Sequence, residues 1–359
     1  MTKIAILADV HLGISNRQKD ILWALNTIKK YCTKVNIQNI IILGDLFHNR
    51  QSLDIDVLCA AYNFFKDTKE HGQTWVAFPG NHDMFLKHSW DINSLKPLSE
   101  VLTIIDSVKI LKINNCRFWI LPFIYSESSY LKILQKIEQQ YKTGDVLLTH
   151  IGVCAAKLNI CFLLQQWNLI DLSLSKFHRI YAGHFHLKQQ VGNNLWYPGS
   201  IIPFKFDEGD SPHGFYIYNT ETNDHEFINI WDIGLEESPA PQYKNLHGDY
   251  LEEKKSEDIH NCNIRIAATK DYSPHEKQKI RERLVEMGAR YVVFTDILRE
   301  DDDVRLDPNE EGEAIKIEDL FEKWYDIDTR GTKELQRNLA LKLNREIIQE
   351  GNEIYTQQN

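Results

Sequence analysis

Residues 3–11 read KIAILADVH, an apolar run that ends on a carboxylate and an imidazole two positions apart. A short apolar run of this kind is typical of a buried strand. On an extended segment, Asp9 and His11 lie on one side, because side chains alternate with a period of two. The stretch therefore predicts a buried strand that brings two potential metal ligands to one edge of a sheet.

The same arrangement recurs further along the chain. Short apolar runs alternate with helical patterns, for example at residues 20–31 and 54–69, which predicts β-α-β units and an α/β fold. Open α/β sheets place ligands at the carboxyl ends of their strands, where the polar residues of this chain gather. Five clusters follow apolar runs, in the order Asp9-Val10-His11, Gly44-Asp45-Leu46-Phe47-His48, Gly80-Asn81-His82-Asp83, Thr149-His150 and Gly183-His184-Phe185-His186.

The residue types in these clusters indicate a metal site. Imidazole nitrogens with carboxylate and amide oxygens suit Mn, Fe or Zn, and the lack of cysteine disfavours a purely structural zinc site. Two ions about 3.5–4 Å apart are well served by a bridging carboxylate, a role that suits Asp45. Each fragment alone has an ordinary alternative, such as a turn at Gly80-Asn81. The ordered set of five carries the hypothesis.

Composition limits the class of protein. The 359 residues are 43% apolar and 26% charged, which is typical of a globular protein of roughly two domains. No apolar run approaches the ~20 residues of a membrane helix, and the N-terminus does not resemble a signal peptide. The six cysteines form no C-x-x-C pair, which favours reduced thiols over a disulfide framework or zinc finger. We expect a cytoplasmic protein with no membrane partner.

Charge is distributed unevenly along the chain. The net charge is −10, but residues 1–206 hold 22 Lys and Arg against 15 Asp and Glu, whereas residues 207–359 hold 19 against 36. The first part is able to meet a polyanion that the second part would repel. Two solvated surfaces of unequal charge would give the same composition.

The second half predicts a smaller unit and two terminal helices. Residues 263–269 and 290–298 form candidate strands around a helix, which opens with the capping box Ser273-Pro274-His275-Glu276 and ends at Gly288. Amphipathic patterns at about 315–326 and 332–350 predict the final helices. The expected organisation is a main domain at 1–233, a linker at 234–262, a small α/β capping domain at 263–312 and C-terminal helices at 313–359.

The five clusters resemble the signature of the calcineurin-like metallophosphoesterases, over roughly residues 1–232. The resemblance implies a sandwich of two β-sheets flanked by helices, with a dinuclear metal centre. It implies that His82 stabilises or protonates the leaving oxygen, and that Asp83 orients the His82 imidazole. Carried over by motif, one ion would be held by Asp9, His11, Asp45 and His186, and the other by Asp45, Asn81, His150 and His184.

Details of the motifs look like the nuclease-subunit branch of SbcCD-type DNA repair complexes. In that branch a histidine three positions after the bridging aspartate contacts the scissile nucleotide, and His48 stands there. Residues 196–200 (WYPGS) and 211–215 (SPHGF) loosely resemble bacteriophage recombination endonuclease subunits. Protein phosphatases carry Asp-Arg-Gly and Gly-Asn-His-Glu, which this chain lacks, and their absence argues against that activity.

The resemblance implies partners as well. Manganese is the activating ion expected in that branch, while the ligand types equally suit iron or zinc, and magnesium is a further option. The branch implies a homodimer and an SbcC-like ABC-type ATPase that binds the C-terminal helices; packing of these helices on their own domain is the alternative. DNA backbone contacts are expected from basic residues near the clusters, namely Arg17, Lys19, Arg50, Lys87, Lys157, Lys188 and Lys205.

The sequence thus predicts a metal-dependent DNA exonuclease or endonuclease. A small-substrate phosphodiesterase of the same superfamily is one alternative, although the ~120 residues after the catalytic region exceed what such an enzyme requires. A non-catalytic DNA-tethering subunit is the other, although such a protein has no physical need for seven metal ligands.

Overall fold

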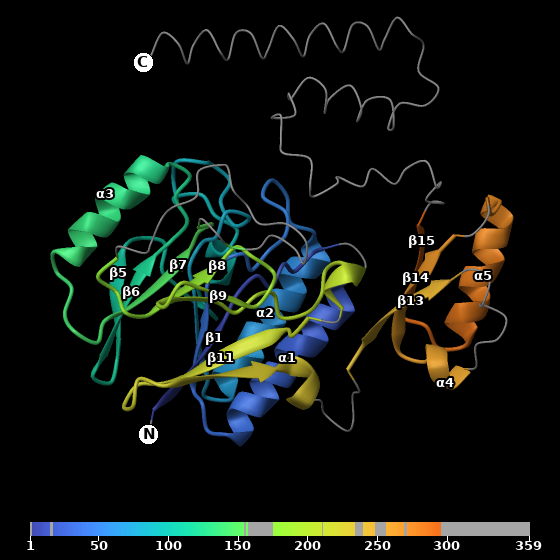
Figure 1. Cartoon of the computed structure of the whole chain (residues 1–359), viewed down its shortest axis with the longest axis horizontal. Coiled ribbons are helices and arrows are strands. Elements are labelled where there is room, and N and C mark those ends of the chain that lie inside the picture. Colours follow the sequence, from blue (N-terminus) through green and yellow to red (C-terminus); the bar gives the residue numbers. More distant parts are fainter. Residues whose placement is uncertain are drawn as a thin grey trace, which may run out of the picture. The chain divides into compact units, whose positions relative to one another are not determined.

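The computed structural model describes residues 2–14, 17–153, 156, 175–209, 211–233, 240–247, 256–268 and 271–295 (Figure 1). The amphipathic segments expected at 315–326 and 332–350 lie outside these residues, as does Lys157. The helices are α1 (Gln18–Lys34), α2 (Ile55–Glu70), α3 (Glu127–Glu138), α4 (Ser256–Ile259) and α5 (Pro274–Glu286), with short 3-10 turns η1 (Lys96–Leu98), η2 (Phe206–Glu208) and η3 (Ile230–Ile233).

Two six-stranded sheets form the main part of the fold. The first has the order β12 (His225–Asn229), β11 (Gly214–Asn219), β1 (Lys3–Leu7), β2 (Asn39–Ile42), β3 (Thr74–Ala77) and β4 (Thr103–Ile104), with β1 to β4 parallel. The second has the order β5 (Lys109–Ile113), β6 (Cys116–Leu121), β7 (Val146–His150), β8 (Ile180–Gly183), β10 (Leu195–Tyr197) and β9 (Gln189–Val191), with β6, β7, β8 and β10 parallel.

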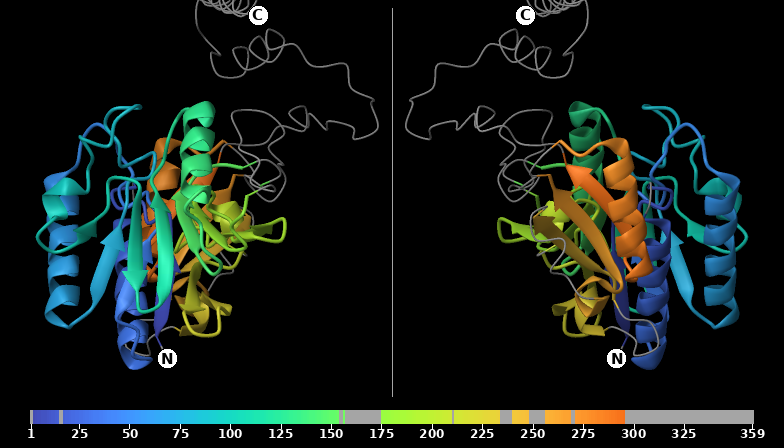
Figure 2. Two further views of the ribbon diagram at one scale, coloured as in Figure 1. Left: turned by 90° about the vertical axis from the view of Figure 1, so that its left-hand side faces the viewer. Right: turned by 90° about the vertical axis from the view of Figure 1, so that its right-hand side faces the viewer.

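The alternation of side chains on β1 explains how the layers stack. Ala5 and Leu7 point outward into a core shared with α1 and α2, and Ile4 and Ile6 point inward into a core shared with the second sheet. A third core packs α3 on the outer face of the second sheet. Figure 1 shows the same order across the view, from α3 through the two sheets to α1 and α2, and Figure 2 views the layers from either side. The predicted sandwich of two sheets flanked by helices is confirmed.

A third sheet is built from β13 (Gln242–His247), β14 (Cys262–Ala267) and β15 (Tyr291–Thr295), all parallel. Helix α5 begins with the predicted capping box, in which Ser273 and Glu276 bond each other's backbone amides. The segment expected as a linker at 234–262 is not all linker, because it contains β13 and α4. The edge strand β13 was missed because its sequence, QYKNLH, has no period-2 pattern: its apolar residues Tyr243 and Leu246 lie three positions apart.

Buried charges tie α1 to the third sheet. Asp20 on α1 accepts hydrogen bonds from Tyr243 Oη (3.2 Å), Asn263 Nδ2 (2.7 Å) and Arg290 Nε (2.8 Å). The neighbouring Arg17 is 4% exposed, and its guanidinium carbon lies 4.9 Å from the ring centre of Tyr243. Arg17 therefore does not have the exposed position that a DNA backbone contact requires, and that expectation is wrong because aromatic rings enclose the side chain.

Candidate metal centre

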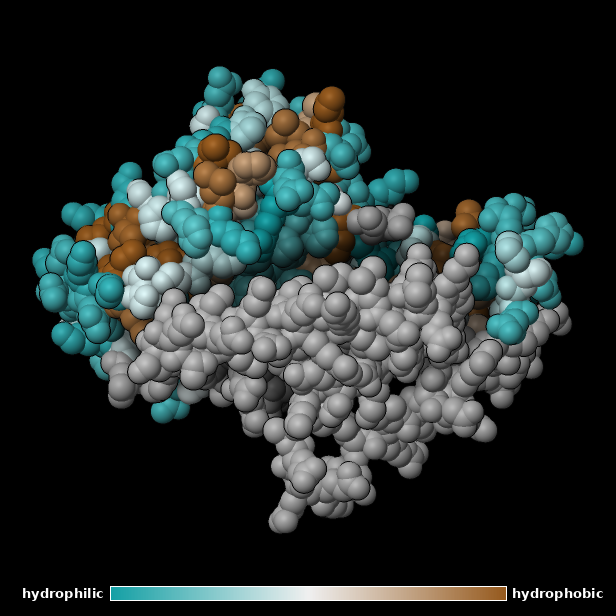
Figure 3. Space-filling view, turned by 90° about the horizontal axis from the view of Figure 1, so that it is seen from above, coloured by the Kyte–Doolittle hydropathy of each residue, from teal (hydrophilic) through white to brown (hydrophobic). Residues whose placement is uncertain are grey.

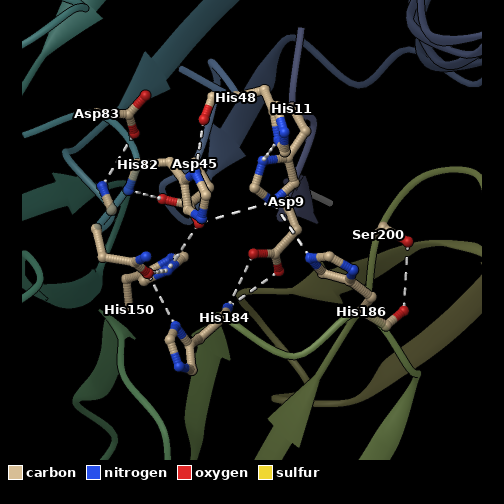
Figure 4. Close-up of polar contacts among 12 residues, drawn as sticks. Asp9, His11, Asp45, His48, His82, Asp83, His150, His184, His186 and Ser200 are labelled. Atoms are coloured by element: carbon tan, nitrogen blue, oxygen red, sulfur yellow. Dashed lines mark hydrogen bonds and ion pairs between the residues drawn. The ribbon is translucent and has the colours of Figure 1, made fainter. Parts of the chain in front are cut away.

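The seven predicted ligands converge at the carboxyl ends of the parallel strands, and all of them except Asn81 are labelled in Figure 4. They form a continuous chain of contacts from His186 to His184. His186 Nε2 lies 3.2 Å from His11 Nε2, which in turn lies 3.7 Å from Asp45 Oδ2. The same Asp45 oxygen lies 3.4 Å from His150 Nε2. The cluster therefore has Asp45 at its centre, between two sets of nitrogen atoms.

Asn81 and Asp9 complete the two ends of this cluster. Asn81 Oδ1 lies 3.0 Å from His150 Nε2 and 2.9 Å from His184 Nδ1. The backbone N–H of His184 donates to both oxygens of Asp9, at 3.0 and 3.1 Å. Three groups of possible ligand atoms lie within 4.8 Å of one another, namely Asp9, His11 and His186; Asp9, Asp45 and His150; and His11, His48 and His82.

The backbone is strained where it carries these ligands. Asp9, His11 and Asp45 have φ of 52°, 52° and 53°, and His184 has φ of 115°. Non-glycine residues rarely adopt such angles, and they persist only where the surrounding structure enforces them. Each angle turns the chain at a strand end, so that the side chain that follows the buried run points into the shared centre.

Glycines in the motifs let the strand ends approach closely. A Cβ on Gly80 would lie 2.2 Å from Asp45 Oδ1, and a Cβ on Gly44, whose φ is +85°, would lie 2.6 Å from His150 Nδ1. Both glycines are therefore required by the packing of the ligands themselves.

The carboxylates and the central histidine have strongly perturbed ionisation. Burial raises the pKa of Asp9 to about 8. Burial would also raise the pKa of Asp45, but His150, His11 and His82 hold it below its usual value. Burial would lower the pKa of His150, but the Asp45 carboxylate raises it to about 9. No Lys or Arg of the described residues pairs with Asp9 or Asp45, so the positive charge that faces the Asp45 carboxylate is that of His150.

The other ligand histidines are neutral donors. Burial lowers the pKa of His184 to about 3 and also lowers the pKa values of His11 and His186. Neutral imidazoles and carboxylates are the forms that bind a divalent ion. A hydrogen bond also fixes the orientation of His150. Its Nδ1 donates to Leu43 O (2.7 Å), which leaves Nε2 as the metal-binding nitrogen. The donor set therefore fits divalent metal ions.

His82 and His48 lie beside the cluster. Their rings stack with centres 5.4 Å apart, and His82 lies edge-on to His11 with centres 4.8 Å apart. The Nδ1 of His82 donates to His48 O (2.6 Å), and the His82 backbone N–H donates to Asp45 Oδ1 (2.7 Å). Both histidines thus lie next to the candidate ligands, with His82 Nε2 left for a further partner.

Asp83 has a different role from the expected one. Its carboxylate accepts from the backbone N–H groups of Gly80 (3.0 Å), Phe47 (3.1 Å) and Leu46 (3.3 Å), whereas the Nδ1 of His82 is bonded to His48. The expectation that Asp83 orients the His82 imidazole is therefore wrong. Asp83 instead joins the loop after β3 to the loop after β2, because its two oxygens accept from these amides and from Ser94 Oγ (3.2 Å).

Several residues that contact the ligands were not predicted. Phe204 lies edge-on to His186 with ring centres 5.0 Å apart, and Glu208 Oε1 lies 4.0 Å from His186 Nδ1. Phe123 stacks on His184 with ring centres 6.1 Å apart. Both ring nitrogens of the buried His213 face carbonyl oxygens, at Ser200 and Glu208. Phe123, Phe204 and Glu208 belong to none of the five motifs, whereas His213 lies in the SPHGF stretch at 211–215 noted in the sequence.

The predicted basic residues fall into different environments. Lys19, Lys87, Lys188 and Lys205 are exposed, and Arg50 is half-buried. Arg50 and Lys87 come together over one aromatic ring, that of Tyr125, at 5.6 and 5.5 Å from its centre. This pairing of two cations from separate loops could not be seen in the sequence.

The fold and site agree with a comparison with known families. Residues 2–188, about half of the chain, match the model of the calcineurin-like phosphoesterases, and the chain belongs to that family. The resemblance seen in the five motifs is therefore confirmed. Together with the buried cluster, it makes the chain a metal-dependent phosphodiester hydrolase.

Individual relatives are distant. "Putative phosphoesterase 244L" of Invertebrate iridescent virus 6 is 24% identical over 58% of this chain and 73% of its own length. Exonuclease subunit 1 of Enterobacteria phage T4 is 23% identical over 90% of this chain and 91% of its own length. A subunit of the nuclease SbcCD of Staphylococcus epidermidis is 23% identical over 75% of this chain and 77% of its own length. Among the described residues, no helix has the length and apolar character to cross a bilayer.

Proposed function

We propose that this chain is a DNA nuclease that hydrolyses phosphodiester bonds with two divalent ions, as the nuclease subunit of an SbcCD-type complex. The observation that carries the proposal is the convergence of seven ligand side chains from five strand ends, with Asp45 at the centre. Two relatives that match most of the chain are named as nuclease subunits, which supports DNA as the substrate.

The geometry supports a division of the ligands between two ions that share Asp45. Asp9, His11 and His186 would complete one site, and the contacts among them support this set. Asn81, His150 and His184 would complete the other. Two ions held in this way supply Lewis acidity to the phosphate and lower the pKa of the attacking water.

His82 is the residue that we assign to the leaving group. Its Nδ1 is committed to His48 O, so a proton donated to the leaving oxygen would come from Nε2. The stacked His48 would contact the nucleotide next to the scissile bond. Asp83 stays outside this proton path, because its oxygens hold backbone amides.

Manganese is the proposed activating ion, with magnesium, iron and zinc as the alternatives to be compared. The ligand types support divalent metals as a class without selecting among these.

The proposal includes two protein partners. We assign residues 1–233 to the nuclease domain and residues 263–312 to a capping domain. The C-terminal helices at 313–359 would bind an SbcC-like ATPase, and the nuclease would form a homodimer, which light scattering of the purified chain would measure. The word "subunit" in the names of both relatives supports an assembly.

The test is hydrolysis of end-labelled linear DNA, single- and double-stranded, by the purified chain with manganese and with magnesium. We expect metal-dependent degradation that is lost in His82→Ala. The matched control is His71→Ala, because His71 is exposed and, among the described residues, its side chain bonds to Asp67 of the helix that it follows.

Two other results would replace the proposal. Cleavage of bis(p-nitrophenyl) phosphate without DNA degradation or DNA binding at low salt would favour a small-substrate phosphodiesterase. DNA binding without hydrolysis of any substrate, with any of the four ions, would favour a tethering protein.

A further inference from the structure

A cavity of about 610 Å³ opens beside the metal cluster. One wall is the loop that follows the candidate ligand Asn81, including Met84 and Trp90, and the other is the loop between β6 and α3, including Phe123 and Tyr125. Its volume lies within the usual range for a small-molecule or cofactor site. Seen from above the view of Figure 1, the described surface carries groups of hydrophobic side chains among hydrophilic ones (Figure 3).

The cavity and the metal cluster share a wall. Phe123 lines the cavity and also stacks on His184, with an angle of 18° between the rings. Its backbone N–H donates to Pro79 O (3.1 Å), and its carbonyl accepts from Trp90 Nε1 (2.9 Å). These hydrogen bonds hold Phe123 in place. A ligand in the cavity would therefore be separated from the candidate metal ligand His184 by the Phe123 ring.

Aromatic rings and cations meet at the cavity in a way that suits a nucleotide. Tyr125 lies edge-on to Phe123 with ring centres 4.9 Å apart. The Tyr125 hydroxyl accepts from Arg50 Nη1, and Lys87 Nζ lies 5.5 Å from the centre of the same ring. Neither cation is paired with a carboxylate within the part of the chain that the structure describes, so both are available to a phosphate.

The opposite side of the cavity offers hydrogen-bond acceptors. Asp106 is paired with Lys96 (3.6 Å), but Asp91 is bonded to the hydroxyl of Ser89 and carries no salt bridge to a described residue. Nucleobases present N–H donors on their edges, which these oxygens could accept. Aromatic walls, two cations and an acceptor edge are together the features that recognise a base with its phosphate.

From this juxtaposition we propose that the cavity binds one unpaired nucleobase of the DNA, from a nucleotide next to the scissile phosphate. Tyr125 provides the aromatic surface for the base, and Arg50 and Lys87 contact the phosphate of that nucleotide. The inference rests on the proposed nuclease function and sharpens its substrate class. A base that is stacked in a duplex cannot enter such a cavity, so the enzyme needs an unpaired nucleotide at the cleavage position.

The experiment measures binding of fluorescein-labelled decathymidylate by the full chain in EDTA, using fluorescence anisotropy. The comparison ligand is the same backbone with abasic residues, which has the same charge but no base. We expect the wild-type chain to bind the decathymidylate at least about fivefold more tightly than the abasic strand.

Variants separate the ring from the charges. Tyr125→Ala should remove the preference for bases, whereas Tyr125→Phe, which keeps the ring, should retain it. Arg50→Gln should weaken binding of both ligands by the same factor, because it removes a phosphate contact. Equal binding of the two strands by the wild type, or equal loss of both in Tyr125→Ala, would overturn the inference.

A second readout separates this inference from the proposed function. Methyl p-nitrophenyl phosphate carries no base, so its hydrolysis by the wild-type chain measures the metal centre without the cavity. If no variant or wild-type chain hydrolyses this ester or DNA with any metal, the proposed function fails, whatever the anisotropy shows. If hydrolysis is normal but the base preference is absent, only the cavity assignment fails.

Discussion

Asp45 and Asp20 are both 2% exposed, yet their surroundings differ. Asp20 accepts hydrogen bonds from Tyr243, Asn263 and Arg290, so a fixed cation and two neutral donors satisfy it. Around Asp45 the neighbours are histidines, and the nearby Asp9 adds a second buried carboxylate. Burying a charge that has no fixed counter-charge lowers the stability of the folded state by roughly several kcal/mol.

The difference separates a structural site from a functional one. The Asp20 cluster is complete within the protein, and its contacts join α1 to the third sheet. In the Asp45 cluster, burial raises the pKa of Asp9 to about 8, and the buried carboxylates become balanced only when divalent cations replace the protons. Substitutions at the two carboxylates, and changes of pH and metal, test whether they differ in this way.

The largest effect is expected for Asp45→Asn. Removing the shared carboxylate should lower hydrolysis by more than the roughly 100-fold that loss of an outer-sphere partner of a metal ligand costs. Rates with bis(p-nitrophenyl) phosphate and manganese measure this effect. Asp20→Asn is the matched control and should retain activity. If Asp45→Asn is as active as the wild type, Asp45 is not part of a functional metal site.

His82→Ala should lower kcat by about 10²- to 10⁴-fold, the usual contribution of a general acid. Because His82 lies beside the ligand set and outside it, the variant should keep its metal. Elemental analysis of the dialysed protein, run alongside the kinetics, distinguishes this result from a loss of ions.

Asp20→Asn should lower the free energy of unfolding by about 2 kcal/mol, less than a fully buried pair, because the Arg290 side chain is 27% exposed. Urea denaturation of the metal-free chain measures the change. Asp224→Asn, at an exposed position, is the control and should have no effect beyond a few tenths of a kcal/mol. A stability unchanged by Asp20→Asn would show that the contacts to the third sheet are weak.

The smallest effect is a slope of stability with pH. The folded-state pKa is raised to about 8 for Asp9, about 7 for Asp83 and about 9 for His150. Between pH 7 and 9 the folded chain therefore loses protons that the unfolded chain has already lost, and stability falls as pH rises. The Tm in EDTA should decline over this window.

The same slope should be smaller in Asp45→Asn, because the Asp45 charge helps to raise all three pKa values. Added manganese should flatten it too. A Tm in EDTA that is constant or increases from pH 7 to 9 would contradict the assignment of the buried protons.

The metal cluster was predictable because its ligands follow the strands that carry them. Each apolar run ended in a short motif. Strands β1 and β2 of the first sheet carry Asp9 and Asp45, and strands β7 and β8 of the second sheet carry His150 and His184 to the same end of the sandwich. The rule that ligands gather at the carboxyl ends of parallel strands therefore located the site. The residue pattern did not predict the strained φ angles of Asp9 and Asp45.

The Asp20 cluster and the cavity were not predictable in this way. Arg290 lies 270 positions from Asp20, and no periodicity relates them. Arg17, close to Asp20 in the chain, was expected to contact DNA because its charge was counted without its burial. Likewise, Tyr125 joins Arg50 and Lys87 through the folding of three separate loops, and only the tertiary fold brings them together.

The most direct test of the central claim is a titration of the metal-free chain with manganese while hydrolysis of bis(p-nitrophenyl) phosphate is followed. The account predicts that the rate rises until two ions are bound per chain and then stays constant, and that Asp45→Asn shows no such rise. Full activity with one ion per chain, or in EDTA, would contradict a centre in which Asp45 is shared by two ions.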